Sequence, residues 1–201
     1  MKHHLLLFLT LFLAFTACKK DKNDDDQNTS DAEFYILGKI DGESFRLEAT
    51  PTNDIEMSTS NSGSIGTPNC VFDYGAYLGA FDQNVFPQSG IDFVSYFDGD
   101  CADEETLYND LFPTGTQAFL NEAAGGKGVQ VVYIDASGYY SSAKGAQSGA
   151  QFTITKSEEA NDIFGLSQTI TGTVKCTLYD EFGNKKELTD GSFRLNFRSY
   201  F

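Results

Sequence analysis

Four cysteines, at positions 18, 70, 101 and 176, carry the most predictable chemistry in this chain of 201 residues. The segments around Cys70 and Cys101 alternate apolar and polar side chains, as strands do. A hairpin in which paired residue numbers sum to 171 brings the apolar faces together and sets Cys70 opposite Cys101. Directly opposed strand residues lie within disulfide range. We therefore expect a Cys70–Cys101 bridge, worth roughly 3–4 kcal/mol in the chain-entropy model, and a buried, unbridged Cys176.

Cys18 follows a segment with the features of an export signal. Lys2 precedes a nearly unbroken apolar run from Leu5 to Phe15, and a run of this length is too short to span a bilayer stably. The sequence Phe15-Thr16-Ala17-Cys18 resembles a bacterial lipobox, which implies cleavage before Cys18 and acylation of its thiol and new N-terminus. We expect residues 1–17 to be a signal peptide, residues 18–32 an acylated cysteine with a disordered acidic tether, and residues 33–201 a folded domain.

The tether gives a second indication of location. Residues 19–31 contain lysines, aspartates and other polar side chains and no apolar residue, so they cannot bury enough surface to offset chain entropy. The stretch serves at least as a spacer from the lipid surface. An Asp-rich patch directly behind the acylated cysteine also resembles the surface-export signal of Bacteroidetes lipoproteins. That resemblance implies attachment to the lipid bilayer of the outer membrane through Cys18, with the domain exposed at the cell surface.

Cleavage before Cys18 removes both histidines, His3 and His4, from the mature chain. Without histidine, a Ser-His-Asp triad, a Cys-His pair and any His-ligated metal centre are excluded. Removal of Lys2 from the 14 basic side chains leaves 13 against 29 acidic ones, a formal charge of −16. Such a charge argues against nucleic acid as a partner. A carboxylate-pair hydrolase needs only two acidic groups, but no acidic residue lies in a sequence setting apolar enough to single it out, so we expect no enzyme.

Period-two alternation dominates from Glu33 onward and predicts an all-β, mainly antiparallel domain, a single β-sandwich with one short helix around 103–112. Asp41-Gly42 is a hairpin turn that sets Ile36 opposite Leu47. The region 50–69 reads as a long loop that has room for one edge strand. In the hairpin with the sum of 171, Tyr74 faces Phe97. In the last hairpin the inward positions change parity, which predicts a bulge at Asp190-Gly191.

The outward face of the 70–101 hairpin is the main candidate binding surface. Aromatic side chains interleave there with Gly75 and Gly79, which suits stacking on sugar rings or gripping an extended peptide. The alternative is that Leu107, Tyr108 and Leu111 of the short helix cover this face. A second exposed pair is predicted beside Gly138, with an ordinary turn as its alternative. The candidate ligand-binding residues are Tyr77, Phe81, Tyr96, Phe86, Tyr139 and Tyr140.

A corner rich in carboxylates lies beside Cys101. Asp98, Asp100 and Asp103 could hold a structural calcium ion, since hard cations take several carboxylate oxygens. Their spacing does not match an EF-hand loop, and acidic residues are also favoured at a helix N-terminus. We therefore expect no cofactor and keep calcium as the weaker alternative.

The closing hairpin, 170–178 with 188–197, resembles that of small Bacteroidetes lipoproteins whose domain has no assigned function. The segments 37–45 and 151–155 are similar to that group as well. The resemblance implies a β-sandwich in the cell envelope and transfers no catalytic residue. We expect a non-catalytic binding module for a glycan or a partner protein. The alternatives are a structural component of the envelope and, less favoured, a carboxylate-dependent glycosidase.

Overall fold

The computed structural model describes residues 30–65, 69–80, 87–98, 108–121, 127–159 and 165–199, without the side chains of 64, 65, 69, 70 and 95–98. The described residues include eleven strands, one short 3-10 turn and two helical residues, Tyr108 and Asn109. No helix among the described residues is long and apolar enough to cross a membrane. The elements are β1 Phe34–Ile40, β2 Glu43–Ala49, β3 Ile55–Ile65, β4 Asn69–Ala80, β5 Gln88–Asp98, β6 Gly115–Gln117, β7 Gly128–Asp135, β8 Gly138–Ser141, η3 Ser142–Lys144, β9 Gln151–Glu159, β10 Leu166–Tyr179 and β11 Lys185–Ser199.

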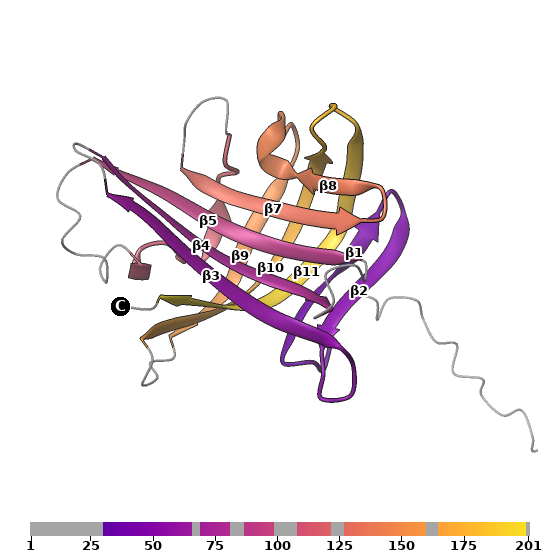
Figure 1. Cartoon of the computed structure of the whole chain (residues 1–201), viewed down its shortest axis with the longest axis horizontal. Helices are drawn as coiled ribbons and strands as arrows, with labels where there is room; N and C mark the ends of the chain where they lie inside the picture. The colour runs from indigo at the N-terminus through magenta and orange to yellow at the C-terminus, as the bar shows by residue number, and fades with distance from the viewer. Residues whose placement is uncertain are drawn as a thin grey trace, which may run out of the picture.

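All eleven strands belong to one antiparallel sheet that curls over itself. Its main path runs β2-β1-β11-β10-β8-β7-β5-β4-β3, and β9 continues from β10 to β6. In Figure 1, β3, β4, β5 and β7 form a front layer that crosses steeply over a back layer of β1, β2, β9, β10 and β11. The end strands β2 and β3 contact each other, although no ladder joins them within the described residues. The sheet is therefore nearly closed.

The core lies between the two layers because each strand turns alternate side chains inward. On β4 Phe72, Tyr74, Ala76 and Leu78 are buried, and on β5 Ile91 and Phe93 belong to the same core cluster. Phe152 and Ile154 of β9 are buried, as predicted. The all-β, antiparallel class is confirmed, and the two packed layers are halves of one sheet. The largest fully buried side chains include Tyr74, Tyr108, Phe152, Phe193, Phe197, Ile36, Leu37 and Leu47.

Two predicted hairpins are confirmed, the first in its register and the last in its bulge. Ile36 pairs with Leu47 across the Asp41-Gly42 turn, where both turn residues have positive φ, 53° and 86°, as a tight hairpin turn requires. In the β10–β11 ladder, Val174 pairs with Gly191 but Cys176 pairs with Leu188. The register shift between them is the predicted bulge.

The β4–β5 hairpin differs from the prediction by four residues. Paired numbers sum to 167, so Tyr74 faces Phe93 and Cys70 faces Phe97. An even shift keeps the same side chains inward, so the apolar pattern could not distinguish the two registers. The register that supported a Cys70–Cys101 pair is therefore wrong. Cys101 lies outside the described residues, and the bridge stays a prediction without that support.

Cys176 is free and buried on the core face of β10, as expected. Burial, with a smaller contribution from Glu187, raises the pKa of its thiol far above the ordinary range. A thiol that resists ionisation is unreactive toward electrophiles. Cys176 therefore has the properties of a small apolar core residue.

Much of the predicted long loop at 50–69 is strand. β3 spans eleven residues and pairs along its whole length with β4. Its sequence is rich in serine, threonine and asparagine, which favoured the prediction of a loop. These residues are equally compatible with an edge strand that has one solvated face. The polar side chains make this long edge unattractive for uncontrolled strand pairing.

The segment predicted as a helix lies inside the molecule where it is described. Residues 103–107 are outside the described part, and among residues 108–112 Tyr108 and Asn109 are helical. The Tyr108 ring centroid lies 5.0 Å from that of Tyr74, and Phe112 lies 4.9 Å from Phe93. Both partners face the core. The expectation that Tyr108 and Leu111 cover the outward face is therefore wrong, because these side chains gain more burial between the layers.

Candidate functional site

The outward face of the front layer brings together the side chains that the core does not use. Strand pairing sets Ser60, Gly75, Asp92 and Gln130 in one row across β3, β4, β5 and β7. The neighbouring row contains Ser58, Tyr77, Gly90, Val132 and Ser141, the last from β8. We call the surface formed by Asp73, Tyr77, Asp92, Gln130 and Tyr139 the outer-face site.

Tyr77 lies flat against the sheet because the positions beneath it are glycines. It pairs directly with Gly90, and a Cβ built on Gly90 would overlap the Tyr77 ring. Its ring also borders Gly75, where a Cβ would meet Tyr77 Cε2 at 2.7 Å. Aromatic side chains commonly cover strand glycines in this way. The arrangement keeps Tyr77 only half-exposed and aims its hydroxyl toward β5.

Asp92 on β5 accepts a hydrogen bond from the Tyr77 hydroxyl. The acceptor is its Oδ1 atom, and Asp92 is 5% exposed although it points away from the core. Burial raises the pKa of Asp92 to about 7; the Tyr77 hydrogen bond opposes this rise and the charge of Asp73 adds to it. Asp92 is thus a carboxyl that takes up or releases a proton near neutral pH.

Asp73 is the second carboxyl on this face and lies two residues before Gly75 on β4. Its Oδ1 atom is buried and has no hydrogen-bond partner among the described residues. Burial raises the pKa of this side chain as well. A buried polar atom without a partner costs about 1–3 kcal/mol, and more when charged.

Gln130 and Tyr139 extend the site onto β7 and β8. Gln130 Nε2 donates to the Tyr139 hydroxyl at 3.0 Å and to Ser141 Oγ at 2.9 Å. Tyr139 is 41% exposed, and Lys144 Nζ lies 4.9 Å from its ring centroid. The pKa of Tyr77 is raised mainly by burial, then by Asp92 and Asp73, and least by Tyr139. The two tyrosines therefore interact electrostatically across the site.

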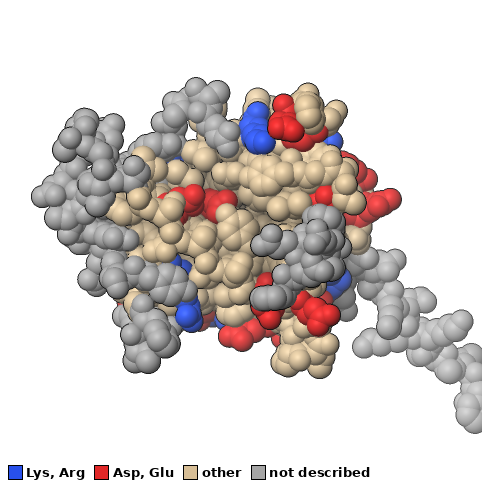
Figure 2. All heavy atoms as spheres, viewed as in Figure 1, with Lys and Arg blue, Asp and Glu red and all other residues tan. Residues whose placement is uncertain are grey.

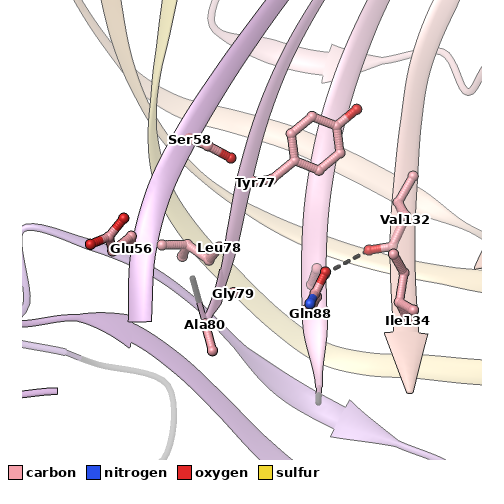
Figure 3. Close-up of a pocket in the computed structure, with 10 residues that line it drawn as sticks. Glu56, Ser58, Tyr77, Leu78, Gly79, Ala80, Gln88, Val132 and Ile134 are labelled. Atoms are coloured by element: carbon pink, nitrogen blue, oxygen red, sulfur yellow. Dashed lines mark hydrogen bonds between the residues drawn. The ribbon is translucent and has the colours of Figure 1, made fainter. Parts of the chain in front are cut away.

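A cavity of about 340 Å³ adjoins the site on the side of Tyr77 (Figure 3). Tyr77 reaches from β4, Val132 and Ile134 stand on β7, and Glu56 comes from β3. Gln88 lies close over Gly79, and the backbone is fixed nearby by Ser89 Oγ, which donates to the Val132 carbonyl at 2.7 Å. The cavity therefore combines an aromatic wall, several aliphatic side chains and a carboxylate.

The predicted site residues divide into three groups. Tyr77 and Tyr139 lie on the same face, as components of one site. The prediction that Tyr140 is exposed is wrong, because it follows Tyr139 along β8 and its side chain points to the opposite, buried face. Lys186 Nζ lies 4.8 Å from the centroid of its ring. The third group lies outside the described residues or side chains: Cys18, Phe81, Phe86, Tyr96, Asp98, Asp100, Cys101 and Asp103. Within the described part, no three acidic, cysteine or histidine residues are grouped so that they could hold a metal ion.

Sequence reasoning missed Asp73, Asp92 and Gln130. The statement that no acidic residue has a distinctive setting is wrong for Asp92. The available signal was the alternation itself, since Asp73, Gly75 and Tyr77 share a strand face, but the correct β4–β5 register is needed to bring Asp92 beside them. Comparison of the chain with protein-family models, with curated proteins and with solved structures finds no match.

Proposed function

We propose that this protein is a non-catalytic binding module for a glycan, anchored in the outer membrane through acylated Cys18 and exposed at the cell surface. The observation that carries the binding role is the outer-face site with its adjoining cavity. Sugar rings stack on aromatic faces and exchange hydrogen bonds through their hydroxyls. Tyr77, Tyr139, Gln130 and the two aspartates supply both kinds of contact on one surface.

The binding role is tested with a glycan array probed by the detergent-solubilised mature chain. We expect selective signals that weaken in a Tyr139→Ala variant, because this ring is exposed beside the cavity wall at Ile134. Phe182→Ala is the matched control: Phe182 is 81% exposed in the β10–β11 turn and does not line the cavity. Silence across the array, or equal loss in both variants, would reject the glycan site.

Anchoring through Cys18 is tested by fractionation of a Gram-negative host that expresses the full chain. The wild-type protein should be in the outer-membrane fraction and accessible to protease added to intact cells. A Cys18→Ala variant should be absent from that fraction, because it has no thiol to acylate. Retention of the variant in the membrane would contradict the proposed anchor.

A carboxylate-pair hydrolase is a second candidate, favoured by one observation. Asp92 has a pKa of about 7 beside another carboxyl, and a general acid in a glycosidase needs such a raised value. Against it, Asp92 is covered by Tyr77 and hardly exposed. We expect array-positive glycans to stay intact after long incubation. Release of reducing ends that disappears in Asp92→Asn would instead establish the enzyme.

A further inference from the structure

The acidic groups of the outer-face site lack a positive partner in the described part of the chain. The interactions that shift the pKa of Asp73 and Asp92 include no lysine or arginine. Tyr77 gives Asp92 its one hydrogen bond from a described side chain, and Asp73 Oδ1 has none. In Figure 2, acidic atoms lie in the middle of the face formed by β4, β5 and β7, and basic atoms lie toward its margins.

The backbone is shaped to hold this arrangement. A Cβ on Gly75 would overlap Asp92 Oδ1 and would lie 2.6 Å from Ser60 Oγ. Glycine at position 75 therefore leaves the space in which the Asp92 carboxyl lies against the sheet. Two carboxyls on neighbouring strands, one of them nine-tenths buried, repel each other when both are ionised. The pair is therefore unfavourable to the extent that Asp92, with its pKa of about 7, is ionised, and a bound cation would relieve it.

The surrounding groups suit an organic cation. Tyr77 offers an aromatic ring, and a ring face attracts an ammonium group by about 0.5–2 kcal/mol, depending on solvation. The Tyr139 ring already has Lys144 Nζ 4.9 Å from its centroid. The cavity beyond Tyr77 has Glu56 in its wall and no lysine or arginine among its lining residues. Asp73 is only partly buried as a residue, so a ligand can reach its carboxyl from solvent.

We infer that the outer-face site recognises a protonated amine on its ligand, so that the bound glycan contains an unacetylated amino sugar. This inference rests on the proposed glycan-binding function and assigns its ligand class. The ammonium group lies against Asp73, which a ligand can reach, and near the Tyr77 ring that covers Asp92. The sugar that carries it extends toward the cavity.

The test compares two hexamers with the same β-1,4-linked backbone, one of glucosamine and one of N-acetylglucosamine. Binding to the detergent-solubilised mature chain is measured by calorimetry at about pH 6.5. We expect the glucosamine hexamer to bind at least about tenfold more tightly, which corresponds to about 1.4 kcal/mol. Asp73→Asn should abolish that preference. This variant removes a poorly compensated buried charge, so it is expected to fold.

Overall charge attraction is controlled with Glu181→Gln. Glu181 is exposed in the β10–β11 turn, and its replacement changes the net charge by the same unit as Asp73→Asn. The preference should survive in Glu181→Gln; equal loss in both variants would overturn the inference. If both hexamers bind alike and both lose affinity in Tyr139→Ala, the glycan site stands and the amine inference fails. If neither binds, the amine inference fails, and the array decides the glycan proposal separately.

Discussion

Asp92 is a residue whose ionisation is coupled to folding. Its ordinary pKa of 3.8 rises to about 7 in the folded chain, because burial disfavours the charge. Between about pH 4 and pH 7 the folded chain therefore keeps a proton that the unfolded chain has released. Stability falls as pH rises through this window and changes no further above it. The full cost is at most about 4 kcal/mol.

Asp92→Asn should remove this dependence while it keeps an oxygen that accepts from Tyr77. We expect the variant to gain stability relative to the wild type by about 2–4 kcal/mol between pH 4.5 and pH 8. Urea unfolding at several pH values measures the difference. The exposed Glu181→Gln variant is the control and should follow the wild-type curve. A constant offset between Asp92→Asn and the wild type across the window would contradict the assigned pKa.

At the scale of the strand pair, Tyr77 and Gly90 fix the register of β4 and β5. The ring occupies the space that a side chain at position 90 would need. Gly90→Ala should therefore cost about 1–3 kcal/mol by overpacking. In a Tyr77→Ala background that space is free, and the same methyl group should cost much less.

The double-mutant cycle isolates this contact. Free energies of unfolding are measured for the wild type, both single variants and the double variant. A coupling energy of about 1 kcal/mol or more is expected for side chains in direct contact. An equal cost of Gly90→Ala in both backgrounds would show that Tyr77 does not fix the register.

The same pair explains how far the sequence predicts the elements. Local signals were sufficient where a short turn dictates the register, as at Asp41-Gly42, or where parity changes within one strand, as at Asp190. They failed for β4 and β5 because the connecting loop allows several even shifts. The choice between them depends on large side chains meeting glycines across the sheet, and the opposed cysteines favoured the wrong register.

The candidate site was predictable to the extent that it depends on strand alternation. Tyr77 follows from its outward position on β4, and Tyr139 from its place beside the Gly138 turn. Asp92 could not be recognised, because its burial arises from a contact between two strands and from the missing side chain at Gly75. The alternation of apolar and polar residues does not predict which polar residues of an outward face are buried.

On the scale of the whole molecule, an aromatic cluster joins the two layers. Phe93 of β5 lies 5.9 Å from Phe152 of β9 and 5.3 Å from Phe197 of β11 between ring centroids. Phe112 lies 4.9 Å from Phe93 and 5.2 Å from Phe197, and so contacts both layers. Tyr108 adds a hydrogen bond of 2.7 Å from its hydroxyl to the Phe197 carbonyl. The segment 108–112 therefore fills the interior where the layers face each other.

Phe112→Ala should leave a cavity between the layers and cost about 3–5 kcal/mol. Because this is a large share of the stability of an ordinary domain, Phe112→Leu is measured beside it and should cost less, since it keeps most of the apolar volume. Phe182→Ala is the control, an aromatic truncation of a ring that is 81% exposed, which should change stability by under about 0.5 kcal/mol. Urea unfolding gives all three values. If Phe112→Ala costs no more than Phe182→Ala, the segment does not join the layers, and the outer face of β4 and β5 becomes the remaining place for it to pack.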